Sequence, residues 1–208
     1  MTQIEMIEKE VDGINKWFKI KGDDAFVDII DGWIVSGKNT YMEHVKQNKV
    51  CVQAGGYCGI FPRLFAQMFD MVYTFEPDPD NFYCLTLNCQ SANIIKNQAA
   101  LGDTHEMVNV VRRVDSNRGM NVVVPNQGDA AITIPTYRID DLNLTHCDLI
   151  MLDVEGYEKF ILRGAEETIA KFKPVVVVED TNMDIEELLF KHGYTKRSTT
   201  HRDTIYSV

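Results

Sequence analysis

The sequence predicts a single α/β domain whose sheet is mostly parallel and covered on both faces. Four largely apolar stretches have the composition of strands buried on both sides, and they lie at 49–54, 71–76, 147–153 and 174–179. Segments with helical spacing of apolar residues alternate with them along the chain. With 208 residues, of which 45% are hydrophobic, the chain is long enough to bury one substantial core.

Residues 1–48 are expected to form an N-terminal helical segment, and residues 49–208 the main domain. In the first part, apolar residues recur at helical spacing and predict an amphipathic helix over 4–18: Ile4, Ile7, Val11, Ile14 and Phe18. Residues 25–39 mix apolar and acidic positions and favour neither helix nor strand. A short helix at about 40–48 is expected to lead into the first strand of the sheet.

The remaining elements complete the alternation. A third strand of the sheet is predicted at 94–98, and helices are predicted at 60–69, 80–89, 158–172 and 184–192. Three β-rich pieces between 107 and 137 are broken by Asn, Gly and Pro, which indicates antiparallel hairpins and a β-rich insertion at about 107–135. The chain is predicted to end in a hairpin.

Composition and charge exclude several classes of function. The net charge of −10 opposes unaided binding to nucleic acid, because Lys and Arg contacts to phosphate dominate that affinity. No stretch approaches the roughly 18 consecutive apolar residues of a membrane helix, and the first residues lack a signal pattern. Five cysteines without CxxC spacing favour reduced thiols over a zinc site. We therefore expect a cytoplasmic protein that contacts neither membrane nor nucleic acid, in an oligomeric state that the sequence leaves open.

The stretch VCVQAGGYCGI, residues 50–60, places a glycine turn between a predicted strand and a predicted helix. Gly55, Gly56 and Gly59 would let the backbone approach a ligand closely, and the helix offers free N–H groups. Taken alone, the turn fits a cofactor loop and a tight packing turn equally well. Glu76 ends the next strand, where an acid can accept the hydroxyl hydrogens of an adenosine ribose. Together the loop and the acid favour a nucleoside cofactor.

Two classes of cofactor fit these residues. The loop is a degraded form of the GxGxxG dinucleotide fingerprint, with Ala54 at the first glycine. It also fits the shorter glycine-rich loop of enzymes that use S-adenosylmethionine, a cofactor with no pyrophosphate to cradle. NAD and S-adenosylmethionine therefore both remain open on the loop and the acid alone.

Three further stretches decide between the two cofactors. "DLIMLDVEGYEKFILRGAEETIAKFKPVVVVE", "FEPDPDNF" and "TYRIDDL" resemble the FkbM family of S-adenosylmethionine-dependent methyltransferases. The family pattern has a DxGANxG-like first loop, an EP pair after the second strand, and a K-x-D-x-E-G segment before LRGAEE. The chain resembles this pattern over about 49–180, with matches at Gly55, Gly59, Glu76, Pro77, Asp153, Glu155, Gly156 and Leu162 to Glu167.

The resemblance implies the Rossmann-like sheet of class I methyltransferases, with strand order 3-2-1-4-5-7-6 and the last strand antiparallel. It implies S-adenosyl-L-methionine as cofactor and methyl transfer to oxygen, with a small or sugar-like hydroxyl compound as the acceptor. The N-terminal segment is then expected to lie over the cofactor cleft as a lid on the acceptor side.

The resemblance also nominates site residues. The expected cofactor-binding set is Gln53, Ala54, Gly55, Tyr57, Gly59, Glu76, Pro77 and Asp153. Asp153 and Glu155 flank the end of the fourth strand of the sheet and are the expected catalytic residues, with Asp153 in contact with cofactor or substrate and Glu155 as the base. An alternative for Glu155 or Glu158 is support of the loop or capping of the next helix. No metal is expected, although Asp153 with Glu179 and Asp180 could form a cation site of oxygen ligands.

The chain departs from the family pattern at three positions. Gln53 stands where the family has aspartate, Tyr57 where it has asparagine, and Met151 where it has lysine. Glutamine can still accept a hydrogen bond from the cofactor's ammonium group but loses the charge attraction. These departures keep open a second hypothesis, a catalytically inactive methyltransferase-like module that binds a nucleoside. An NAD-dependent oxidoreductase is the third and weakest.

Overall fold

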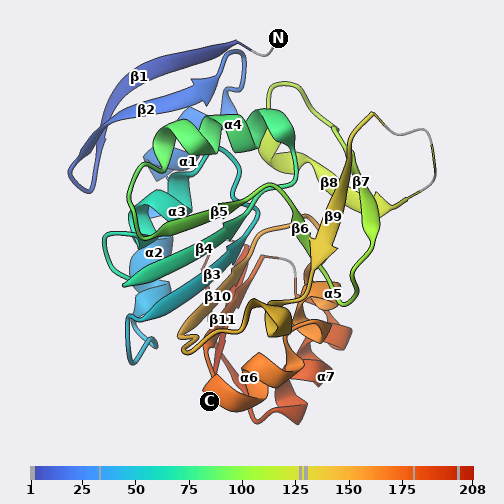
Figure 1. Cartoon of the computed structure of the whole chain (residues 1–208). Helices are drawn as coiled ribbons and strands as arrows, with labels where there is room; N and C mark the ends of the chain where they lie inside the picture. The colour runs from blue at the N-terminus through green and yellow to red at the C-terminus, as the bar shows by residue number, and fades with distance from the viewer. Residues whose placement is uncertain (1–2, 33, 127, 129–130, 180, 201) are drawn as a thin grey trace.

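The centre of the molecule is a twisted sheet of seven strands within the described residues of the computed structural model (Figure 1). The structure describes residues 3–32, 34–126, 128, 131–179, 181–200 and 202–208. The strands of this sheet are β3 (Val50–Ala54), β4 (Met71–Phe75), β5 (Ile94–Asn97), β10 (Leu149–Leu152), β11 (Val175–Val178), β12 (Thr195–Thr200) and β13 (Asp203–Ser207). Every residue of β3, β10 and β11 is buried, which explains why these strands read as continuous apolar runs.

The spatial order of the strands is β12-β13-β11-β10-β3-β4-β5. Numbered along the chain and read from the β5 edge, this is 3-2-1-4-5-7-6, and β13 runs antiparallel to β11. The order reverses between β3 and β10, which pair in parallel with Leu152 opposite Ala54. Ligands of open α/β sheets bind outside the carboxyl ends of the strands at such a switch point.

Helices cover both faces of this sheet. They are α1 (Ala25–Gly32), α2 (Ile34–Met42), α3 (Ile60–Phe65), α4 (Pro79–Asn88), α5 (Glu158–Arg163), α6 (Glu166–Phe172) and α7 (Met183–Lys191). Residues of α5, α6 and α7 pack into one core cluster, and residues of α2, α3 and α4 into a second. The prediction of one helix over 158–172 was wrong, because the chain breaks at Gly164. A Cβ atom there would lie 2.0 Å from the carbonyl oxygen of Gly102, so backbone packs on backbone.

The β-rich insertion forms a small second sheet beside the first (Figure 1). Its strands are β6 (Ala100–Leu101), β7 (Met107–Val111), β8 (Val122–Pro125) and β9 (Thr133–Tyr137). β7 pairs antiparallel with both β8 and β9, as the sequence predicted for this region. Short 3-10 helices, η1 (Arg118–Met120) and η2 (Ile139–Leu142), lie between β7 and β8 and after β9.

The predicted helix over 4–18 was wrong: these residues form the antiparallel hairpin of β1 (Ile4–Val11) and β2 (Ile14–Ile20). The signal against a helix was the Asp12-Gly13 pair, a strong marker of a two-residue hairpin turn. Both residues have positive φ, 49° and 81°, as a type I′ turn requires. The predicted helix over 40–48 was also wrong, because α2 ends at Met42.

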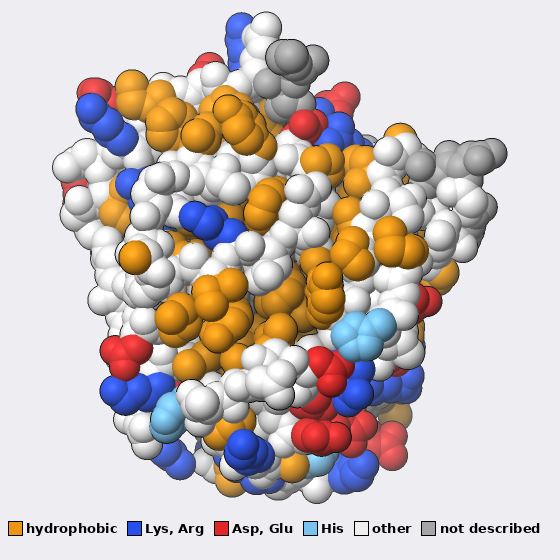
Figure 2. Space-filling model, in the orientation of Figure 1, with side chains coloured by type: hydrophobic (Ala, Val, Ile, Leu, Met, Phe, Trp, Pro, Cys, Tyr) orange, Lys and Arg blue, Asp and Glu red, His pale blue; other side chains and the backbone are white. Residues whose placement is uncertain are grey.

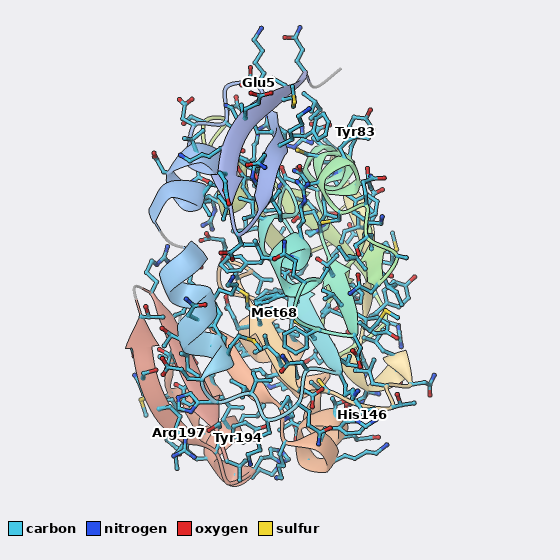
Figure 3. All side chains as sticks on the ribbon, turned by 90° about the vertical axis from the view of Figure 1, so that its left-hand side faces the viewer. Glu5, Met68, Tyr83, His146, Tyr194 and Arg197 are labelled. Atoms are coloured by element: carbon cyan, nitrogen blue, oxygen red, sulfur yellow. The ribbon has the colours of Figure 1, made fainter. Side chains whose placement is uncertain are left out.

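The two terminal hairpins lie at opposite ends of the molecule in the side view (Figure 3), with Glu5 on the first and Arg197 on the second. On the face seen in Figure 2, hydrophobic side chains gather over the middle, from the central sheet toward the insertion.

Across the described part of the chain, every helix is too short or too polar to span a membrane.

Candidate active site

A cavity of about 410 Å³ lies at the carboxyl ends of the central strands, a volume typical of small-molecule sites. Three of its walls come from the carboxyl ends of strands and the loops that follow: Ala54 and Gly55 at β3, Glu76 and Pro77 after β4, and Asp153 and Glu155 after β10. Helices α1 and α2, the start of α4, the insertion and the C-terminal hairpin also contribute to the lining. Tyr57 also lines the cavity, whereas Gln53 and Gly59 do not.

The two glycines of the pattern are required for different reasons. Gly55 has a φ of +84°, and a Cβ atom there would lie 1.8 Å from the carbonyl oxygen of Asp153. The loop after β3 therefore rests directly on the loop after β10. Gly59 also has positive φ, but its Cβ would meet Cys89 Sγ at 2.8 Å and Leu85 Cα at 3.1 Å. Packing against α4 accounts for Gly59 without any ligand.

Gln53 is fully buried and its amide is used inside the protein. Its Oε1 accepts a hydrogen bond from the Thr74 hydroxyl at 2.6 Å, and its Nε2 donates to the carbonyl oxygen of Gly55 at 2.8 Å. These bonds brace the glycine loop from behind. A direct contact between Gln53 and a cofactor stays a prediction, and the buried position of Gln53 does not support it.

Tyr57 occupies the left-handed region, with φ of 47°, where asparagine is better tolerated than a bulky residue. Its backbone N–H donates to Glu76 Oε2 at 2.6 Å, and its hydroxyl donates to the carboxylate of Asp23. Met151, the third departure from the pattern, is buried in β10 and packs in the core between the sheet and its helices.

Glu76 is buried at the end of β4 and receives several donors. Besides the Tyr57 N–H, its Oε1 accepts from the N–H of Asp78 at 2.8 Å and from Asn81 Nδ2 at 3.4 Å. Burial nevertheless raises the pKa of this carboxyl from 4.5 to about 8, because desolvation outweighs these hydrogen bonds. The group is thus held in place at the wall of the cavity.

A group of carboxylates forms the other end of the cavity. Ligand oxygens of Asp153, Glu155 and Glu179 lie within 4.8 Å of one another, a set that could also hold a hard cation. Burial, and then the neighbouring Glu179, raises the pKa of Asp153 well above its usual value. Arg202 Nη1 contacts Glu179 Oε1 at 2.8 Å. Asp180, the further acid considered from the sequence, lies outside the described residues.

Glu158 supports the loop after β10. Glu158 Oε1 accepts weak hydrogen bonds from the N–H groups of Val154 at 3.4 Å and Gly156 at 3.3 Å. Glu155 has a φ of 54° and lines the cavity. Its position leaves it next to the space where substrate would lie.

A family model described as the methyltransferase FkbM domain matches residues 61–196, more than half of the chain. The chain belongs to the FkbM methyltransferase family. The matched range contains Glu76, Asp153 and Glu155, and it begins just after the glycine loop. None of the curated proteins compared matches the chain.

One solved structure supports the fold, and others are more distantly similar. An FkbM methyltransferase from Methylobacillus flagellatus KT is 18% identical, with a TM-score of 0.51, over 78% of this chain and 44% of that one. A precorrin-6y C5,15-methyltransferase from Geobacter metallireducens GS-15 is 11% identical, with a TM-score of 0.49, over 85% of this chain and 90% of that one. The FkbM chain described here thus spans less than half the length of the FkbM structure.

The family implies S-adenosylmethionine, and the residues present fit an adenosine group. Glu76 would supply the acid for a ribose, and the neighbouring Asn81 also lines the cavity. The Oδ1 atom of Asn81 is buried and lacks a hydrogen-bond partner within the described part of the chain, so a ligand hydroxyl would satisfy it.

Sequence reasoning missed several residues that line the cavity: Tyr41, Asn81, Arg118, Arg202 and Asp203. Tyr41 donates its hydroxyl to Asp203, although the two are 162 positions apart. No local spacing connects such residues, because they come from α2, α4, the insertion and the C-terminal hairpin. Only the folded chain brings them together.

Proposed function

We propose that the protein is an S-adenosylmethionine-dependent methyltransferase that methylates a hydroxyl oxygen of a small or sugar-like acceptor. The observation that carries the proposal is that one cavity joins Gly55, Glu76 and Asp153, three predicted site residues from three strand ends. Family membership and the fold support S-adenosylmethionine-dependent methylation in general.

In this proposal Glu76 accepts hydrogen bonds from the ribose, and Ala54, Gly55, Tyr57 and Pro77 form the adjoining wall. Asp153 then lies toward the methionine part of the cofactor. The carboxylates around Asp153 complement the positive charge that this part carries. The bound cofactor supplies an electrophilic methyl group on a sulfonium sulfur.

The acceptor hydroxyl must lose its proton as the new carbon–oxygen bond forms and the carbon–sulfur bond breaks. Glu155 is the proposed base, since it lines the cavity beside Asp153. Asp153, whose pKa is raised by burial and by Glu179, is proposed to contact the cofactor or the substrate rather than to act as the base. Asp28, Ile29 and Tyr41 of the N-terminal segment line the same cavity and are proposed to cover the acceptor.

Calorimetry with S-adenosylmethionine, S-adenosylhomocysteine and NAD tests the cofactor. We expect both sulfur nucleotides to bind and NAD not to bind. If neither S-adenosylmethionine nor S-adenosylhomocysteine binds at millimolar concentration, the proposal is refuted. Retained turnover after chelation and dialysis is expected, since no step requires a metal.

A second candidate is a catalytically inactive module that binds the nucleoside. It is favoured by one observation: the amide of Gln53 is committed to Thr74 and Gly55, so the family's charged contact at this position is missing. Slow background demethylation of S-adenosylmethionine, lost in Glu155→Gln, would favour the enzyme. Binding with no turnover in either protein would favour the module.

A further inference from the structure

The insertion reaches over the cavity at the place where Glu76 lies. Its η1 turn carries Arg118, which lines the cavity together with Asn81 at the start of α4. Asn81 links the two: its Nδ2 donates to the carbonyl oxygen of Arg118 at 3.0 Å and to Glu76 Oε1 at 3.4 Å. The Asn81 amide therefore bridges the Glu76 carboxyl and the backbone of Arg118.

The turn that carries Arg118 is held from two sides. On one side, Arg112, which precedes the turn, donates two hydrogen bonds to the carboxylate of Asp78. Its Nε lies 2.6 Å from Oδ2 and its Nη2 lies 2.9 Å from Oδ1. On the other side, the N–H of Asp24 donates to the carbonyl oxygen of Ser116 at 3.1 Å. These contacts fix the backbone of the insertion against both α4 and the N-terminal segment, so the position of Arg118 is defined by the fold.

Several side-chain atoms of Arg118 and Asn81 lack hydrogen-bond partners inside the part of the protein that the structure describes. Within the described residues, Nε and Nη1 of Arg118 and Oδ1 of Asn81 are buried and have no hydrogen-bond partner. The remaining Nη2 of Arg118 contacts Asp115 at 3.1 Å, but that carboxylate is 93% exposed, so this pair adds little. Buried polar groups are nearly always paired, and Arg118 and Asn81 both line the cavity, so a ligand there could supply the missing partners.

We propose that Arg118 and Asn81 complete, with Glu76, a site for the two neighbouring hydroxyls of the cofactor's ribose. Each hydroxyl donates one hydrogen bond and accepts others. Glu76 and Asn81 Oδ1 take the hydroxyl hydrogens, and the two guanidinium N–H groups of Arg118 donate to the hydroxyl oxygens. The identity of the nucleoside rests on the proposed function, whereas the insertion's part in binding it is new.

The surroundings oppose other ligand classes. An anion is disfavoured because acids lie close by: Asp23 interacts with Arg118, and Glu76 and Asp78 both contact Asn81. A metal cation is disfavoured by Arg118 itself, whose charge lies at the same place. A neutral group that both donates and accepts, such as a diol, fits the three side chains.

Calorimetry with S-adenosylhomocysteine and its 2′-deoxy and 3′-deoxy analogues tests the proposal on the full chain. Arg118→Met keeps the apolar stem and removes the donors, and Arg113→Met is the matched control, since Arg113 is an exposed arginine of the same insertion. We expect Arg118→Met to weaken S-adenosylhomocysteine binding at least tenfold and Arg113→Met to change it less than twofold. The unaltered protein is expected to prefer the natural ribose to at least one deoxy analogue, and Arg118→Met to lose most of that preference.

Thermal unfolding without ligand separates binding from folding. Arg118→Met should melt no lower than the unaltered protein, because it removes two unpaired buried donors, and Arg118→Lys should restore part of the affinity. Unchanged affinity in Arg118→Met, or a deoxy penalty that is the same in both proteins, would overturn the diol site alone. Failure of the unaltered protein to bind S-adenosylhomocysteine would refute the proposed function, and the diol site with it.

Discussion

Both ends of the cavity contain a buried acid, but the surroundings of the two acids differ. At one end Glu76 accepts hydrogen bonds from two backbone N–H groups and from Asn81. At the other end Asp153 faces Glu155 and Glu179, and repulsion adds to burial in raising its pKa. The first arrangement fixes an acceptor for a neutral ligand group. The second places carboxylates side by side, which favours a positively charged ligand group there.

Gly55 joins the two ends, and its replacement is expected to have the largest effect. Gly55→Ala would place Cβ 1.8 Å from the carbonyl oxygen of Asp153, so the loops after β3 and β10 must separate. We expect a loss of roughly 4 kcal/mol in the free energy of unfolding, measured by urea denaturation. Gly13→Ala is the control, with a similar φ of +81° and nothing within 4 Å. It should lose only about 1–2 kcal/mol, and equal losses would contradict the clash.

Asp78 holds the Glu76 end together, and its removal should rank second. Its fully buried side chain caps α4 through the N–H groups of Asp80 at 2.8 Å and Asn81 at 3.2 Å and also receives Arg112. Asp78→Ala should cost about 3 kcal/mol of unfolding free energy, because it removes the cap and takes one of two carboxylate partners from Arg112. Asp80→Ala removes only one contact to Arg112 and should cost less than about 1 kcal/mol.

The raised pKa of Glu76 predicts that the difference in unfolding free energy between wild type and Glu76→Gln depends on pH. Between pH 4.5 and about 8 the unfolded chain releases this proton and the folded protein keeps it, so the wild type loses stability as pH rises. Glu76→Gln has no such proton. Its stability relative to wild type should therefore grow by about 2–3 kcal/mol from pH 6 to pH 9, measured by urea titrations at each pH. Glu43→Gln, at an exposed glutamate, should show no such trend.

The smallest effect is expected at the carboxylate end. The pKa of Asp153 is raised above 3.8, so its folded form resists ionisation at higher pH. Asp153→Asn removes one of the facing charges and should stabilise the protein by about 1 kcal/mol at pH 8, with the gain vanishing below about pH 4. Any methyl transfer should fall at the same time. A variant that is less stable at pH 8 would mean that Asp153 is held mainly by favourable contacts.

The two terminal hairpins show where sequence patterns succeed and fail. Both are antiparallel pairs, yet the C-terminal one was predicted and the N-terminal one was predicted to be a helix. Over 4–18 the apolar spacing fits a helix, but the Asp12-Gly13 turn selects a hairpin because both residues adopt positive φ. Trp17 and Ile20 of β2 are buried, so tertiary packing stabilises the pairing of β1 with β2. The local residue pattern alone did not show this pairing.

The sequence by itself determined the strands of the central sheet, the family and the three strand ends that carry Gly55, Glu76 and Asp153. Apolar runs and turn residues are local, so they can be read along the chain. Only the tertiary structure placed Arg118, Tyr41 and Asp203 at the cavity, since their partners lie far away in sequence. It also showed that Gln53 braces the loop, because a side chain's direction depends on what packs against it.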